Sequence, residues 1–116
     1  MWKNDDRIMS VLIKDEMEKK EYFPVVCPVC GKREAHSYAH RFKEGEERGG
    51  EWAWCSACRN YEHVSARIPK WWKNPDVIDF NKLAAVPDYL EENKVCIDEW
   101  MNDLLFGEDA EKKTEI

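Results

Sequence analysis

Four of the five cysteines occur in two Cys-x2-Cys pairs that are 24 residues apart. Two such pairs on neighbouring turns can place four sulfur atoms at the corners of a tetrahedron, which is the geometry of structural zinc sites. The usual gap between the pairs is roughly 15–20 residues, so the longer gap here leaves room for two strands and a turn. We therefore predict one zinc ion bound by Cys27, Cys30, Cys55 and Cys58.

Residues 25–68 resemble the zinc ribbon family, also called rubredoxin-like, around these two pairs. The first pair, "CPVCG", matches the family pattern, whereas the second, "CSACR", has Arg59 where a glycine is common. The resemblance implies a three-stranded antiparallel sheet with the four cysteines as metal ligands. Because four thiolates leave the metal no open position, the zinc is expected to be structural. Iron in a rubredoxin-like electron carrier is the alternative, but such a carrier needs little beyond the ribbon itself.

The other residues that could bind metal or catalyse a reaction form weaker patterns. Cys96 has no partner cysteine and is expected to be a small apolar filler before the last helix. His36, His40 and His63 are expected on strand surfaces, with a second metal site from His36, His40 and a glutamate as an alternative that no motif spacing supports. No Gly-rich phosphate loop, G-x-S-x-G or H-E-x-x-H motif occurs, so we predict a protein without enzymatic activity.

The elements that must position these residues indicate an α+β fold in a single domain covering residues 1–116. Residues 1–22 are expected to hold an N-terminal helix from Asp6 to about Lys20. The ribbon is expected over 23–68, with strands at 35–42, 51–55 and 60–68. A connector and C-terminal helices follow over 69–107, and 108–116 are expected to be a flexible tail. The N-terminal helix would present an apolar stripe of Ile8, Met9, Leu12, Ile13 and Met17.

The last element shows the clearest helical pattern, since its apolar residues recur at the spacing of one helix face. Short helical turns are expected before it, the second of them beginning at Pro87. The apolar stripe of the last helix consists of Ile97, Trp100, Met101, Leu104 and Leu105.

Composition sets the compartment that we expect for the protein. No run of 18 apolar residues is present, and the charged N-terminus lacks the apolar core of a signal peptide. We therefore expect a cytoplasmic protein without a membrane partner, in which cysteines stay reduced and bind metal rather than form disulfides. The apolar share of 43% is modest, and six tryptophans are expected to enlarge a thin core, with Trp52 or Trp54 in it.

Charge indicates the kind of partner. The net charge is −1 over residues 1–26, +1 over 27–68 and −6 over 69–116. Nucleic acid is therefore an unfavourable partner, because binding a polyanion requires a basic surface. An acidic surface instead accelerates association with a basic protein, and exposed tryptophans are common anchors in protein interfaces. The predicted partner-binding residues are Trp71, Trp72, Asp98, Glu99 and Asp103.

Residues 54–74 are also similar to the zinc-ribbon immunity proteins that bacteria encode beside polymorphic or contact-dependent toxins, chiefly in "WCSAC" and "PKWW". This resemblance implies a small cytoplasmic protein that binds and neutralises one cognate toxin domain. A nucleic-acid-associated zinc ribbon of the transcription or translation type and the electron carrier remain alternatives. The sequence does not predict the oligomeric state.

Overall fold

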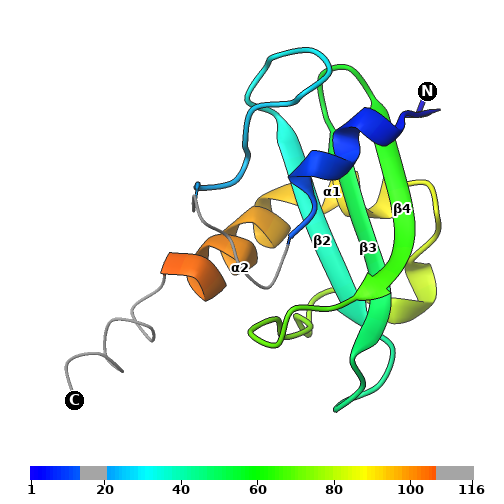
Figure 1. The fold of residues 1–116 in the computed structure, drawn as a ribbon, viewed down its shortest axis with the longest axis vertical. Helices are drawn as coiled ribbons and strands as arrows, with labels where there is room; N and C mark the ends of the chain where they lie inside the picture. Colours follow the sequence, from blue (N-terminus) through cyan, green and yellow to red (C-terminus); the bar gives the residue numbers. More distant parts are fainter. Residues whose placement is uncertain (14–20, 107–116) are drawn as a thin grey trace.

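The structure, a computed structural model, describes residues 1–13 and 21–106 and has an α+β architecture with a four-stranded mixed sheet (Figure 1). Three strands run antiparallel in the order of the chain: β2 (Ala35–Arg41), β3 (Arg48–Cys55) and β4 (Asn60–Arg67). The fourth strand, β1 (Lys3–Asn4), pairs parallel to β4, so the sheet order is β1-β4-β3-β2. The predicted three-stranded antiparallel ribbon is therefore present but is extended by a strand that the sequence did not indicate.

The hairpin between β2 and β3 is tighter than predicted, because β3 begins at Arg48 rather than at residue 51. Gly49 and Gly50 belong to the strand and not to the turn. A Cβ atom on Gly49 would lie 2.0 Å from the backbone oxygen of His40, so only glycine allows the two strands to approach this closely.

The predicted N-terminal helix is wrong over the described residues. Asp6–Val11 form a 3-10 helix, η1, whose cap Asp5 accepts a hydrogen bond from the backbone of Arg7. Ile8 and Val11 are buried, which matches the three-residue turn of a 3-10 helix, whereas Met9 is 38% exposed. The expected continuation to Lys20, including Met17, falls in residues 14–20, which lie outside the described part of the chain.

The C-terminal half forms three short or medium elements: η2 (Phe80–Lys82), α1 (Asp88–Glu92) and α2 (Lys94–Phe106). Pro87 precedes α1, as predicted, and α2 contains the predicted apolar stripe, of which Ile97, Met101 and Leu105 are buried. No helix within residues 1–13 and 21–106 is long and apolar enough to cross a membrane.

The sheet is covered on both faces, with η1 on one side and the C-terminal helices on the other (Figure 1). Trp52 and Trp54 are both buried, which confirms that the ribbon tryptophans belong to the core. Buried tryptophans need a partner for the indole N–H, and both find one in the C-terminal half. Trp52 Nε1 donates to the Ala84 oxygen at 2.8 Å, and Trp54 Nε1 donates to Glu91 Oε1 at 3.0 Å.

Candidate metal centre

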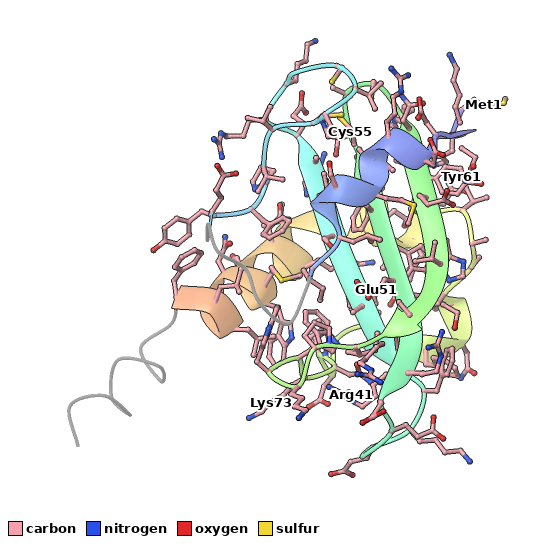
Figure 2. All side chains as sticks on the ribbon, in the orientation of Figure 1. Met1, Arg41, Glu51, Cys55, Tyr61 and Lys73 are labelled. Carbon is pink, nitrogen blue, oxygen red and sulfur yellow. The ribbon has the colours of Figure 1, made fainter. Side chains whose placement is uncertain are left out.

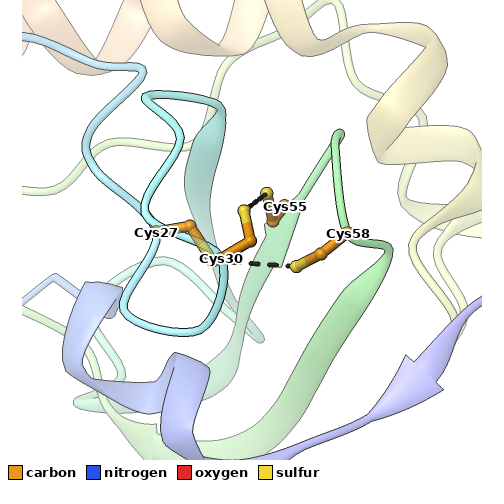
Figure 3. A group of neighbouring side chains, drawn as sticks. All are labelled: Cys27, Cys30, Cys55 and Cys58. Carbon is orange, nitrogen blue, oxygen red and sulfur yellow. Dashed lines mark hydrogen bonds between the residues drawn. The ribbon is translucent and has the colours of Figure 1, made fainter.

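The four predicted cysteines converge at one end of the sheet (Figure 3). Their sulfur atoms all lie within 4.8 Å of one another, with 3.8 Å between Cys27 and Cys58 and 3.7 Å between Cys30 and Cys55. A disulfide needs about 2.05 Å, so these are not disulfides. Zn–S bonds of about 2.3 Å give a tetrahedron whose edges are about 3.8 Å. The sulfur positions therefore fit a tetrahedral metal ion.

Each pair sits in a tight turn that ends in left-handed backbone. In the first turn, the Gly31 N–H donates to the Cys27 oxygen at 2.9 Å, and Gly31 has φ of +81°. In the second, the Arg59 N–H donates to the Cys55 oxygen at 3.0 Å, and Arg59 has φ of +63°. The two turns thus have matching geometry, although only the first has the glycine that this conformation favours. Arg59 stands where the ribbon pattern has a glycine, but its backbone adopts the same left-handed conformation as Gly31.

Arg59, whose left-handed backbone conformation is unfavourable for a residue other than glycine, contacts Trp2 through its side chain. The Arg59 guanidinium lies 4.7 Å from the centre of the Trp2 ring, a cation–π distance. The Lys3 N–H donates to the Arg59 oxygen at 2.8 Å, which begins the pairing of β1 with β4. The N-terminal strand therefore packs directly on the second cysteine turn.

Burial and hydrogen bonds act in opposite directions on the thiols. Burial raises the pKa of Cys27, and it raises the pKa of Cys55 to about 12. Burial alone would also raise the pKa of Cys58, but hydrogen bonds from the backbone and side chain of Asn60 outweigh it and lower that pKa. Asn60 Nδ2 donates to Cys58 Sγ at 3.1 Å, and the Val29 N–H donates to Cys27 Sγ at 3.3 Å. Deprotonation of the buried thiols thus needs a compensating positive charge, which a metal cation supplies.

Within residues 1–13 and 21–106, no second group of three or more His, Cys, Asp or Glu side chains converges in this way. The alternative metal site from His36, His40 and a glutamate is therefore not formed. His36 and His40 are also buried, contrary to the expectation that they lie on a strand surface, because the C-terminal half covers their face of the sheet.

A polar network links the second cysteine turn to the C-terminal helices. His36 Nδ1 lies 2.8 and 3.0 Å from the two carboxylate oxygens of Asp98 on α2, and His36 Nε2 lies 2.9 Å from Ser56 Oγ. Ser56 Oγ in turn donates to Glu91 Oε1 at 2.7 Å. Lys94 Nζ donates to Ser56 Oγ at 3.3 Å and to Glu91 Oε2 at 3.1 Å. These contacts connect β2, the Cys55–Cys58 turn, α1 and α2.

The carboxylate of Glu91 is held in its ionised form by this network. Burial alone would raise its pKa, but hydrogen bonds from Ser56, Lys94 and Trp54 outweigh that effect and lower it. Because the carboxylate accepts three hydrogen bonds in a partly buried position, its charge is compensated inside the fold.

The contacts of Ser56, His36 and Asp98 resemble the order of a Ser-His-Asp triad, in which the histidine removes the serine proton. Here Ser56 Oγ also lies 2.7 Å from Glu91 Oε1, and Lys94 Nζ lies against the same oxygen. Ser56 Oγ is therefore surrounded by three polar partners and presents no free side to a substrate. The geometry supports a positioning role for this network.

The structure divides the predicted partner-binding residues into two groups. Trp72 is only 2% exposed and Asp98 only 9%, so neither is available as a surface contact. Trp72 packs against Tyr38, with 5.6 Å between ring centres, and Asp98 pairs with His36. Trp71 is half-buried, and Glu99 and Asp103 are exposed.

Sequence reasoning missed Ser56, Glu91 and Lys94, and it assigned Asp98 and Cys96 to the wrong environments. Asp98 is predicted to bind a partner, yet it neighbours the buried Met101 and Leu105 at helical spacing. A carboxylate within an apolar stripe was the available signal, since a buried charge requires a partner. Cys96 is exposed and is therefore not an apolar filler.

The metal centre lies at the opposite end of the molecule from the β2–β3 hairpin: Cys55 is at one end of the sheet, and Arg41 and Lys73 are at the other (Figure 2). The four sulfur atoms, the two matching turns and the antiparallel hairpins define a zinc-ribbon-like metal site in an α+β fold. No family model, curated protein or solved structure matches this chain.

Proposed function

We propose that the protein is a non-enzymatic binding module whose metal is zinc and whose zinc site stabilises the fold. The four-thiolate site supports this proposal, because it leaves no coordination position for water or substrate. The network around Ser56 supports it further, since Ser56 on the second cysteine turn is hydrogen-bonded directly to Glu91 on α1 and Lys94 on α2. Metal binding would then position both the ribbon and the C-terminal elements.

The exposed side of α2 is the proposed partner surface, which we define as the outer stripe: Val95, Cys96, Glu99 and Asp103. These residues recur at helical spacing and are all exposed, and the exposed Glu92 lies just before them. The outer stripe contains two carboxylates and no cation. This exposed acidic stripe is the observation that favours a basic protein partner.

A toxin domain is the specific form of partner that we propose. The resemblance of residues 54–74 to zinc-ribbon immunity proteins supports this form of the proposal. Many such toxins act on nucleic acid and are basic, so an acidic surface suits them. In this form, co-expression of the protein would protect cells from the partner.

Affinity purification of the tagged, zinc-loaded protein from its source cells tests the proposal, followed by kinetics with the purified partner. Reversing Glu99 and Asp103 to lysine should slow association and reduce its dependence on salt, because exposed charges act mainly on the association rate. Reversing Glu44 and Glu46 on the β2–β3 turn changes the net charge equally and serves as the matched control.

The alternatives predict different results in the same experiment. A nucleic-acid-associated ribbon would bind DNA or RNA with submicromolar affinity at about 150 mM salt, where surface charges are well screened. An electron carrier would contain iron rather than zinc. Equal association rates for the outer-stripe variant and the Glu44/Glu46 control would contradict the proposed surface.

A further inference from the structure

A concave site lies on the helix-covered face of the sheet, near the β2–β3 hairpin and away from the cysteines. It is a pocket of about 370 Å³, which falls at the lower end of the volumes typical of small-molecule sites. Its walls come from β2, β3, β4 and the segment around η2. The lining includes His40, Trp52, His63, Ser65, Phe80 and Ala84.

Gly50 is one of the residues that line the pocket. In the sheet register, Gly50 lies between His40 on β2 and Ser65 on β4, and the neighbouring row contains Trp52 and His63. Gly50 has no side chain, and the rings of Trp52 and His63 lean over it. A Cβ atom there would lie 2.9 Å from the Trp52 ring and 3.2 Å from His63 Nε2. The absence of a side chain at Gly50 therefore makes room for the Trp52 and His63 rings that line the pocket.

Two stacked pairs of rings line this space. His40 stacks on Phe80, with ring centres 4.6 Å apart and an angle of 18° between the planes. His63 stacks on Trp52 at 4.2 Å and 12°. Phe80 is 54% exposed and therefore stands at the pocket mouth. Flat rings in near-parallel pairs offer faces on which another planar ring can stack.

The lining is uncharged. It contains no Asp, Glu, Lys or Arg side chain. Burial lowers the pKa of His40 and of His63, so both imidazoles are neutral near pH 7. The Tyr38 hydroxyl oxygen lies 3.2 Å from Nδ1 of His40 and forms a hydrogen bond with it. In the described part of the chain, neither Nε2 of His40 nor the ring nitrogens of His63 have a hydrogen-bond partner, so polar groups remain available beside the apolar walls.

We propose that this pocket binds a neutral, planar heteroaromatic molecule of bicyclic size. The ring faces provide stacking, the imidazole nitrogens and Ser65 provide hydrogen bonds, and the absence of charged lining disfavours ionic ligands. The proposal is independent of the protein partner, because none of the outer-stripe residues lines the pocket.

Amide NMR of the full-length, zinc-loaded protein, titrated with benzimidazole at pH 7.5, tests the proposal. This probe is planar, bicyclic and uncharged at that pH, and it has one hydrogen-bond donor and one acceptor. A fragment of about nine non-hydrogen atoms is expected to bind in the millimolar to submillimolar range. Saturable shifts are expected at Gly50, Ser65 and Ala84. Cyclohexanol, which is not planar, should give no saturable shift.

Phe80→Ala removes one face of the pocket mouth and should weaken benzimidazole binding about fivefold. Tyr22→Ala removes an aromatic ring of similar exposure, 62%, that lies outside the pocket lining and the outer stripe, and should leave the affinity unchanged. Ser65→Phe provides a second test, because Ser65 is exposed and a larger side chain there would fill the pocket without disturbing the core.

Three results would overturn the proposal. The first is the absence of saturable shifts with benzimidazole up to about 10 mM, well above the expected dissociation constant. The second is equal binding of cyclohexanol, which would indicate an unselective apolar surface. The third is wild-type affinity in both Phe80→Ala and Ser65→Phe, with their amide spectra showing a folded protein.

Discussion

The contact between Asp98 and His36 should contribute more to stability than any exposed carboxylate on the same helix. Asp98 is 9% exposed, and both of its carboxylate oxygens lie within 3.0 Å of His36 Nδ1. Asp98→Ala removes a charge-assisted hydrogen bond and leaves a buried ring N–H without an acceptor. Together these effects cost about 3 kcal/mol of unfolding free energy. For a chain of this size, that loss lowers the melting temperature by roughly 10–20 °C.

Glu99 provides the matched control, because it is the next residue on α2 and is exposed. Glu99→Ala should change the unfolding free energy by less than about 0.5 kcal/mol. Asp98→Asn should fall between the two, since the amide oxygen still accepts a hydrogen bond from Nδ1. Urea denaturation of the zinc-loaded proteins, followed by tryptophan fluorescence and far-ultraviolet circular dichroism, measures all three.

Zinc content must be equal in the three variants, so that a loss of metal is not mistaken for a loss of the contact. If Asp98→Ala and Glu99→Ala lose the same stability, Asp98 is a surface residue and the proposed link between α2 and the ribbon is wrong. If Asp98→Ala loses its zinc, the network contributes to metal binding as well as to packing.

Three further predictions concern the metal site and its neighbours. Elemental analysis should find one zinc and no iron per chain. Cys30→Ser should lose the zinc and unfold, whereas Cys96→Ser should retain both zinc and fold, although both cysteines are exposed. Arg59→Gly should raise the free energy of unfolding by about 1 kcal/mol in a Trp2→Ala background, because it relieves the backbone strain at this position. The gain should be smaller in the wild type, where the same substitution also removes the cation–π contact with Trp2. Equal gains in both backgrounds would refute this coupling. The folded-state pKa of Glu91 is lowered, so wild type should be more stable than Glu91→Gln above the usual carboxyl pKa of 4.5. This advantage should vanish as the pH falls through the lower folded-state pKa. Urea midpoints from pH 3 to 7 measure it, and an advantage that does not change with pH would show that the reasoning is wrong.

The sequence by itself determined the four-cysteine cluster, the three antiparallel strands and the last helix. Each depends on a local pattern: two residues between cysteines, alternation along a strand, or apolar residues at helical spacing. The tetrahedral convergence of Cys27, Cys30, Cys55 and Cys58 follows from the turns at the two pairs and the hairpin between them. Such features can be inferred without knowing which elements pack together.

Only the tertiary structure decided the features that depend on long-range packing. Lys3 and Asn4 become a strand because Arg59 and Tyr61 offer them an unpaired sheet edge. Likewise, Trp72 is buried because Tyr38 and the rest of the core lie against it.

Asp98 shows the same principle for a charged residue. The sequence predicts Asp98 to be a partner-binding residue, but α2 packs with Asp98 facing β2, where His36 compensates the buried charge. Neither residue indicates the other, since 62 positions separate them in the chain. The pocket around Gly50 likewise forms only where three strands and the η2 segment meet. Local sequence patterns determine which helices and strands form. The packing of these elements against one another determines which side chains are buried in the core, which join the hydrogen-bond network and which stay exposed.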